Sequence, residues 1–211
     1  MYEPPLHRQD DIAEIHALIR AHPLGLLISH GPGGLLANAI PFHLDGEAPQ
    51  LGTLRAHLAR ANGQIADLRE ASEALVVFQG PHHYVTPSWY ATKRETHKVV
   101  PTWNYLVVQA RGRPRVIEDA PWLRAQLEAL VSAREAHREA PWSVSDAPAD
   151  FVAQQMRAIV GLEIEIADLR GKWKASQNRN EADRAGVIAG LEAEGSENAL
   201  AMAEAVRRGG R

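Results

Sequence analysis

The residues best suited to bind a ligand gather between positions 78 and 105, in the stretch FQGPHHYVTPSWYATKRETHKVVPTWNY. Glycine and proline turns alternate there with large aromatic side chains and with amide and ammonium donors, namely Trp89, Tyr90, Trp103, Tyr105, Lys93, Lys98 and Asn104. Rigid turns that hold aromatic rings beside such donors suit a planar, anionic ligand. Taken alone, the stretch is equally consistent with aromatic side chains that cap the end of a β-barrel.

The segment LRAHLARAN, residues 54–62, has the composition of a phosphate site. Strand alternation places Arg55 and His57 on one face, and Arg60 and Asn62 stand in the turn beyond the strand. A phosphate dianion needs guanidinium forks together with neutral donors, and this segment offers both. Solvated arginines at an exposed strand end are the alternative for this segment on its own.

A third segment, GKWKASQNRN at residues 171–180, surrounds one aromatic side chain with hydrogen-bond donors. Beside Trp173 stand Lys172, Lys174, Ser176, Gln177, Asn178 and Arg179. Such a loop is costly to bury unless a ligand or a neighbouring element satisfies its polar groups. The three segments together therefore favour a binding site over a plain core.

The composition limits the class of protein. The chain has 211 residues, 45% of them hydrophobic and 23% charged, which is enough for the core of one large or two small domains. No apolar run approaches the roughly 18 residues of a membrane span, and the polar start MYEPPLHRQDD is not expected to be a signal peptide. Zero cysteines exclude disulfides, thiolate zinc sites and thiol catalysis, and favour a cytoplasmic protein. A net charge of −3 argues against a broad nucleic-acid footprint, although local basic patches survive such averaging.

The first half of the chain has the pattern of a β-rich domain. A helix is expected to begin at Asp10 or Asp11, to carry an apolar stripe at residues 12, 15 and 19, and to end at His22-Pro23. Strands are expected at residues 26–29, 35–43, 50–57, 74–79, 99–110 and 114–117, the last two as a hairpin around Gly112. Short runs joined by glycine and proline turns predict an antiparallel sheet that closes to a barrel.

The second half is mainly helical. Helices are expected at residues 121–138, capped by Asp119, and at residues 151–159, followed by a strand at 162–166 that returns to the barrel. Two more helices, at 181–194 and 197–208, are divided by Gly195-Ser196. We therefore expect an α+β, mainly β chain that forms a single domain over residues 1–211. Its barrel core covers residues 22–118, and residues 119–211 add helices and a returning strand near 160–170.

Four sequence blocks resemble one known family. AHLARAN (56–62), FQGPHHYVTPSWY (78–90), VPTWNY (100–105) and KWKASQNR (172–179) are similar, in this order, to the PaiB-like FMN-binding negative transcriptional regulators. The resemblance extends from about residue 22 to about residue 184. It implies an antiparallel split β-barrel of the FMN-binding type with peripheral and C-terminal helices. It also implies a homodimer that binds FMN between its subunits.

The resemblance also implies which residues hold the flavin. Arg55, His57, Arg60 and Asn62 would lie on the phosphate side. The strand at 37–42 would pass the edge of the isoalloxazine ring, with the backbone of Asn38, Ala39 and Ile40 bonding its polar edge. The site would be closed, partly from the other subunit, by Trp103, Asn104, Lys174, Gln177, Asn178 and Arg179. One departure from the family is Gly63-Gln64-Ile65, where relatives tend to have proline and an aromatic residue that could pack on the ring.

Other functions stay open at this point. A flavin-dependent oxidoreductase acting on a small molecule and a haem-binding split barrel are the alternatives, and no catalytic residue is predicted because no acid–base pair or nucleophile elbow stands out. His82 and His83 are adjacent in a strand and face opposite ways, so no metal site is predicted. Five further histidines are expected at the surface: His7, His16, His30, His97 and His137. Direct DNA binding is weakly supported, since the last helix begins with the acidic Glu197 where phosphate contacts would be needed.

Overall fold

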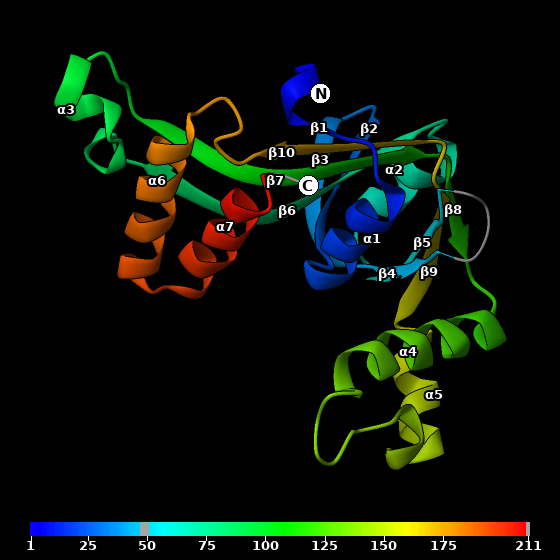
Figure 1. Cartoon of the computed structure of the whole chain (residues 1–211). Helices are drawn as coiled ribbons and strands as arrows, with labels where there is room; N and C mark the ends of the chain where they lie inside the picture. Colours follow the sequence, from blue (N-terminus) through cyan, green and yellow to red (C-terminus); the bar gives the residue numbers. More distant parts are fainter. Residues whose placement is uncertain (47–50, 210–211) are drawn as a thin grey trace. The chain divides into compact units, whose positions relative to one another are not determined.

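The computed structural model describes residues 1–46 and 51–209. Within them the chain forms ten β-strands, seven α-helices and three short 3₁₀ turns (Figure 1). The strands are β1 (Arg8–Gln9), β2 (Leu24–Gly31), β3 (Gly34–Pro41), β4 (His43–Asp45), β5 (Thr53–Ala59), β6 (Ala74–Val85), β7 (Thr102–Gly112), β8 (Pro114–Ile117), β9 (Ile159–Glu165) and β10 (Asp168–Lys174). The helices are α1 (Ile12–Ala21), α2 (Gln64–Glu70), α3 (Thr92–Thr96), α4 (Ala120–Glu135), α5 (Ala149–Arg157), α6 (Glu181–Glu194) and α7 (Glu197–Arg207). The 3₁₀ turns are η1 (Pro5–His7), η2 (Pro87–Trp89) and η3 (Val144–Asp146).

The strands form two sheets with the hydrogen-bonded orders β1-β10-β7-β6-β2-β3 and β4-β5-β9-β8. The strand pairs with a defined register all run antiparallel. This α+β architecture, an antiparallel split β-barrel with peripheral and C-terminal helices, confirms the predicted fold class.

The chain divides into two compact units. Unit 1 comprises Met1–Ala21, Gln79–Gln109 and Arg170–Arg211, and unit 2 comprises His22–Phe78 and Ala110–Leu169. The long strands β6 and β7 contribute residues to both units. The expectation of a single domain over residues 1–211 stays a prediction.

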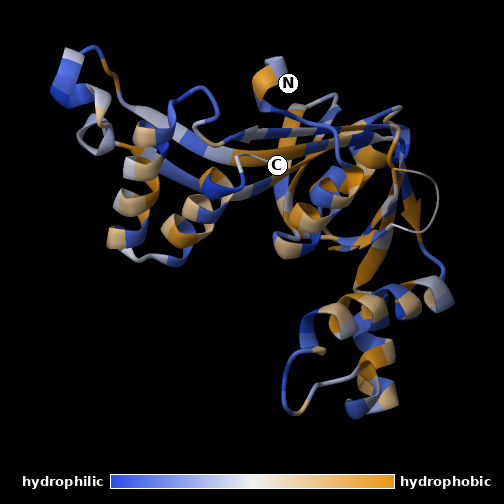
Figure 2. Ribbon diagram, viewed as in Figure 1, coloured by the Kyte–Doolittle hydropathy of each residue, from blue (hydrophilic) through white to orange (hydrophobic). Residues whose placement is uncertain are grey.

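In unit 2, β5 shows how a sheet separates its core from its outer face. Leu54, Ala56 and Leu58 are buried in the core, whereas the alternate residues Arg55 and His57 lie on the opposite face. That opposite face is covered by α4, which is held close because its Trp122 packs on Gly161 of β9. A Cβ atom at position 161 would come within 2.3 Å of the indole, so only glycine allows this approach. The start of β9, which follows α5, is strongly apolar and orange in Figure 2.

In unit 1, α1 packs on the strands through Ile15 and Ile19, both 1% exposed, while Leu18 approaches Gly80 of β6. Helices α6 and α7 pack on each other through buried apolar residues. The indole of Trp89, in η2, lies against Gly190 of α6. Helix α3, blue in Figure 2, has no buried residue. This unit is thus a short sheet covered by three helices.

Several elements begin and end close to their predicted positions. Asp11 caps α1 by accepting hydrogen bonds from the N–H groups of residues 13 and 14, and Asp119 caps α4 by accepting one from residue 122. β8 and α6 have the predicted bounds, and α7 ends one residue early, at Arg207. The returning strand is confirmed as β9, which pairs with β5 and β8.

The predicted hairpin of residues 99–110 with 114–117 is wrong, because β8 pairs with β9 in the other sheet. Only Arg113 separates β7 from β8, and a hairpin needs a connection of about two residues or more. The strand β10 was not predicted, since its polar sequence resembles a loop. His16 is buried and not at the surface, because it lies on the inner side of α1. The strand predicted at 50–57 begins at Thr53, and its first residue, Gln50, lies outside the described residues.

Among residues 1–46 and 51–209, no helix combines the length and the apolarity that crossing a membrane would require.

Candidate functional site

The first two predicted phosphate-side residues lie on β5, beneath α4. Nη1 of Arg55 is 3.1 Å from Oδ2 of Asp45, and its Nε is 3.2 Å from Oε2 of Glu163. Nδ1 of His57 lies 3.1 Å from Oε1 of Gln126, on α4. Both side chains therefore have partners within unit 2, and the charge of Arg55 is balanced by carboxylates.

A cavity of about 120 Å³ lies beside these residues, lined by Arg55, Trp122, Ala125, Gln126 and Ala129. Gln126 is 3% exposed, and its Nε2 has no hydrogen-bond partner among the described residues. A buried amide donor without an acceptor is costly. The cavity thus has one unsatisfied donor and one guanidinium in its wall, and it is too small for a flavin.

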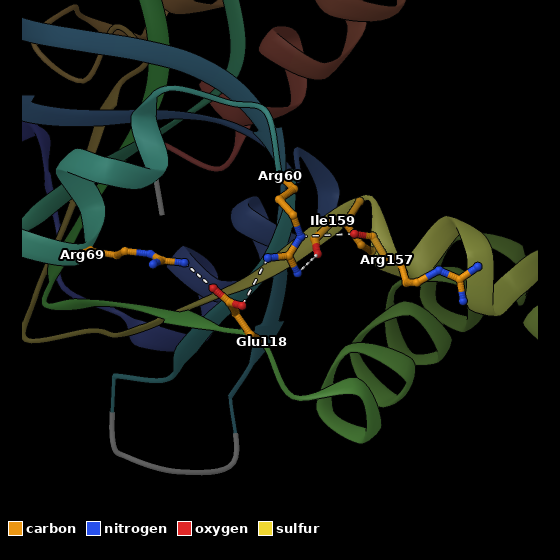
Figure 3. A network of polar contacts seen from close by, with 5 residues as sticks. All are labelled: Arg60, Arg69, Glu118, Arg157 and Ile159. Atoms are coloured by element: carbon orange, nitrogen blue, oxygen red, sulfur yellow. Dashed lines mark hydrogen bonds and ion pairs between the residues drawn. The ribbon is translucent and has the colours of Figure 1, made fainter.

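Arg60 is the centre of a polar network at the end of β5 (Figure 3). Its Nε donates to the carbonyl oxygen of Arg157 at 3.1 Å and its Nη2 to that of Ile159 at 3.2 Å. Its Nη1 donates to Oε2 of Glu118 at 3.2 Å, and the other oxygen of Glu118 accepts from Arg69. One carboxylate therefore bridges two guanidiniums. Hydrogen bonding to Arg60, with the charges of both arginines, holds the pKa of Glu118 below its usual range.

Asn62 and Asn38 both form hydrogen bonds with Gln64. Oδ1 of Asn62 accepts from the backbone N–H of Gln64 at 2.9 Å, at the start of α2. Nδ2 of Asn38 donates to Oε1 of Gln64 at 2.9 Å, and Nε2 of Gln64 donates in turn to Oγ of Ser29 and the carbonyl of Leu27. Gln64 therefore fastens α2 to the sheet through β2 and β3.

The predicted ring-edge residues Asn38, Ala39 and Ile40 lie on β3, the last strand of the six-stranded sheet. Along one side of β3, no further strand is hydrogen-bonded to it within the described part of the chain. An edge strand leaves backbone N–H and C=O groups available to another partner. The predicted use of this backbone to bind the polar edge of a ring is compatible with that position.

The sheet formed by β2, β3 and β6 presents an outer apolar face. Its members, which share one side of the sheet by register, are Leu24, Leu26, Ile28, Ala37, Ala39, Pro41, Leu75 and Val77. Leu24 is 63% exposed in the single chain. Apolar patches of this kind mark surfaces that a ligand or a partner covers.

The other predicted residues belong to unit 1. Asn104 of β7 is fully buried, its Nδ2 donates to Oγ of Ser176 at 2.8 Å, and its Oδ1 has no partner among the described residues. Trp103, the preceding residue, is 53% exposed, with the rings of His82 and Tyr84 at centroid distances of 6.2 and 6.0 Å. β7 therefore presents an unsatisfied buried acceptor and an exposed aromatic surface at neighbouring positions.

The loop after β10 brings its predicted residues together with β7. Lys174 donates to Oγ1 of Thr102. Gln177 accepts from the N–H of Ala175, donates to the carbonyl of Trp173 in β10, and has its Oε1 3.1 Å from Nδ1 of His7. The guanidinium carbon of Arg179 lies 4.3 Å from the centre of the Tyr90 ring. Asn178 is exposed. Burial raises the pKa of Tyr90, against the lowering effect of Arg179, and the hydroxyl has no hydrogen-bond partner in the part of the chain described.

The structure thus places the predicted residues in two groups, one in each unit. Arg55, His57, Arg60, Asn62 and residues 38–40 belong to unit 2, and the residues at 103–104, 174 and 177–179 belong to unit 1. Sequence reasoning did not assign a role to the polar residues that hold the unit 2 group, namely Gln64, Arg69, Glu118 and Gln126. No local pattern marks Glu118 or Gln126, since each matters only through a partner distant in sequence.

The donor sets fit FMN, which combines a phosphate dianion, a hydroxylated chain and an apolar ring with a polar edge. Arg60 and Arg69 share one carboxylate, which a phosphate could replace. The outer apolar face and the edge of β3 suit the ring, and the buried Oδ1 of Asn104 needs a donor. In the described residues, no group of three or more histidine, aspartate or glutamate side chains is placed to hold a metal ion.

Comparisons with known proteins agree with this chemistry. Residues 1–168 match the family model described as "Putative FMN-binding domain". The chain is 38% identical over its whole length to an uncharacterized protein of Emericella nidulans, of which it covers 98%. It is 30% identical to the protease synthase and sporulation protein PAI 2 of Bacillus subtilis, over 97% of this chain and 95% of that protein.

Among solved structures, the FAD and heme binding protein of Mycobacterium smegmatis has a TM-score of 0.61 and 18% identity, over 85% of this chain and 79% of that one. This similarity concerns the fold. The family is established by the sequence matches, which span most of the chain. By its family model and by its full-length likeness to PAI 2, the chain belongs to the PaiB-like FMN-binding family, whose cofactor is FMN.

Proposed function

We propose that this chain is a homodimeric FMN-binding protein that acts as a negative regulator of transcription of the PaiB type. In this proposal the flavin lies between the two subunits. The observation that carries it is the outer apolar face of β2, β3 and β6, which borders an edge strand with available backbone groups.

The outer apolar face supports a dimer because it is costly to leave in water. Leu24 and Leu26 are 63% and 41% exposed in the single chain. Fully burying a leucine contributes about 1.5–3 kcal/mol. A second copy of the same sheet is self-complementary to this face about a two-fold axis, which is the usual form of a homodimer.

Arg60 and Asn62 are assigned to the phosphate side, with Arg55 and His57 behind them on β5. The backbone of Asn38, Ala39 and Ile40 is assigned to the ring's polar edge. The group around Trp103 and Asn104, with the loop at 174–179, is assigned to the part of the site that the partner subunit supplies. When bound, FMN supplies one- and two-electron redox chemistry, which a regulator can use as a signal.

Regulation is supported by the resemblance of the four sequence blocks to the PaiB-like regulators more than by any nucleic-acid surface on α7. Asn198, in the first turn of α7, is bonded in both directions to the backbone of His82. Arg207 pairs with Glu192 and Glu204, and Arg208 pairs with Glu14. These contacts use the helix for packing, so direct DNA contact through it stays the weakly supported part of the proposal. The absence of cysteine supports a cytoplasmic location.

The absorbance spectrum of the purified protein after addition of FMN tests the cofactor and its alternatives. Bound flavin with a protein-dependent band shape is expected, whereas a Soret band would favour the haem alternative. Consumption of NAD(P)H in the presence of small electron acceptors would favour an oxidoreductase. Light scattering tests the dimer, and a monomer mass at micromolar protein would refute it. Transcript levels compared in cells with the wild type and with a variant that does not bind FMN test regulation.

A further inference from the structure

A second basic site lies on unit 2, formed by α2 and by the chain around β8. A surface depression of about 430 Å³ is lined by Arg69, Arg113, Pro114, Arg115 and Val116. Three of its five lining residues are arginines, in a chain whose net charge is −3. Like charges placed together repel, so such a cluster in an acidic chain calls for a counter-anion.

The carboxylates around the depression do not balance these arginines. Glu118 is shared between Arg69 and Arg60, and Glu163 is shared between Arg115 and Arg55. Asp45 adds one further carboxylate to Arg55, and the guanidinium of Arg113 makes no ion pair or hydrogen bond within residues 1–46 and 51–209. Five guanidiniums therefore stand against three carboxylates in this network, which leaves an excess of two positive charges.

Most hydrogen-bond donors of the cluster are also unused. A guanidinium carries five N–H donors in a fixed fork. Arg69 uses one nitrogen on Glu118, and Arg115 uses one on Glu163. Because both are at least half exposed, their remaining donors can reach a ligand in the depression without leaving the existing pairs.

We propose that the depression at Arg69, Arg113 and Arg115 binds a compact phosphate-bearing anion, such as the diphosphate group of a small molecule. Planar forks recognise phosphate oxygens in pairs, and the buried ring of Pro114 gives the site a rigid floor. A concave site suits a compact anion, whereas a nucleic-acid backbone needs contacts spread along a groove. The proposal does not depend on flavin binding, because Arg113 and Arg115 are not assigned to FMN and only Arg69, which shares Glu118 with Arg60, adjoins the proposed phosphate side.

Inorganic pyrophosphate, titrated calorimetrically into the full chain at low and at physiological salt, tests the site. Wild type should bind it, more weakly as salt rises. Arg113→Gln should weaken binding by about tenfold or more, since a charge-assisted hydrogen bond contributes about 1.5–3 kcal/mol and about 1.4 kcal/mol is a factor of ten. Arg113→Lys keeps the charge but not the fork, and should lie between the two. Arg124→Gln, an exposed arginine paired with Glu128 on α4, is the matched control and should bind like wild type.

Two results would overturn the proposal. The first is no pyrophosphate binding to the folded wild type, and binding of duplex DNA in its place would make the cluster a nucleic-acid surface. The second is equal binding by Arg113→Gln. FMN titrations keep the two sites distinguishable, because Arg113→Gln should bind FMN like wild type while it loses affinity for pyrophosphate. Pyrophosphate binding in a protein that fails to bind FMN would refute the proposed function and leave this site intact.

Discussion

Arg60→Ala separates the two roles that the structure gives this arginine. One role is structural, because its side chain donates to the carbonyls of Arg157 and Ile159 and so ties the end of β5 to the start of β9. The other is the proposed contact with the FMN phosphate. The substitution removes both at once, so the two effects must be measured separately.

The structural loss is modest. Hydrogen bonds from charged donors contribute about 1.5–3 kcal/mol at most, and the side chain of Arg60 is 45% exposed, which reduces this to about 1 kcal/mol for each carbonyl. The pair with Glu118 is solvent-exposed and adds little to this loss. We therefore expect Arg60→Ala to lower the free energy of unfolding by about 2 kcal/mol, measured by urea denaturation. The freed carbonyls can be hydrated at this surface, so no larger penalty is expected.

The effect on ligand binding is larger and specific. Losing one arginine fork should weaken FMN binding by about tenfold to a hundredfold, from one or two charge-assisted hydrogen bonds. Riboflavin lacks the phosphate, so it should bind wild type more weakly than FMN and be indifferent to the substitution. Flavin fluorescence titrations of both ligands into wild type and Arg60→Ala measure this, with Arg124→Ala as an exposed control.

The contrast between the ligands decides the outcome. Equal affinity of wild type for FMN and riboflavin, or unchanged FMN binding in Arg60→Ala, would remove Arg60 from the phosphate site. Equal loss of both ligands would show that the structural role alone explains the defect. No binding of either ligand to folded wild type would contradict the flavin assignment itself.

Four more predictions concern Glu118, Leu26 and Gly161. Glu118→Gln should tighten FMN binding by up to about tenfold in the same titration, since Arg60 and Arg69 lose a competing anion. Because the folded-state pKa of Glu118 is lowered, the unfolded chain binds more protons in acid, and the wild type should lose stability as the pH falls below about 4.5. Denaturation at several pH values should show a smaller loss of unfolding free energy in acid for Glu118→Gln. Leu26→Lys, within the outer apolar face, should convert the dimer to a monomer, as measured by light scattering, whereas Leu200→Lys on α7, at similar exposure, should not. A Leu26→Lys variant that stays dimeric would place the interface elsewhere. Gly161→Ala should lower the free energy of unfolding by about 1–3 kcal/mol, because the added methyl meets Trp122. The control Gly33→Ala, whose methyl meets nothing within 4 Å, should change it by less than about 0.5 kcal/mol. Similar unfolding midpoints for the two variants would contradict the close packing of α4.

The sequence by itself determined the elements whose signals are local. Caps such as Asp11 and Asp119 act on N–H groups two or three residues away, and Gly195 ends α6 with a left-handed backbone (φ of 67°). Strand alternation along residues 54–58 separated the core side chains from Arg55 and His57. The four motif blocks identified the family, because they preserve residue types in order over most of the chain.

Only the tertiary structure decided what those residues contact. Arg60 bonds Arg157 and Ile159, which are 97 and 99 residues away, and His57 bonds Gln126, 69 residues away. No local pattern encodes such pairs, since they depend on which strands meet. β8 joins β9 and not β7, because one intervening residue is too short a connection for a hairpin. The residue types in the sequence therefore indicated a site for a phosphate and a flavin. The pairing of distant strands decided which arginines are bonded to backbone carbonyls or carboxylates, and which, like Arg113, keep donors available for a ligand.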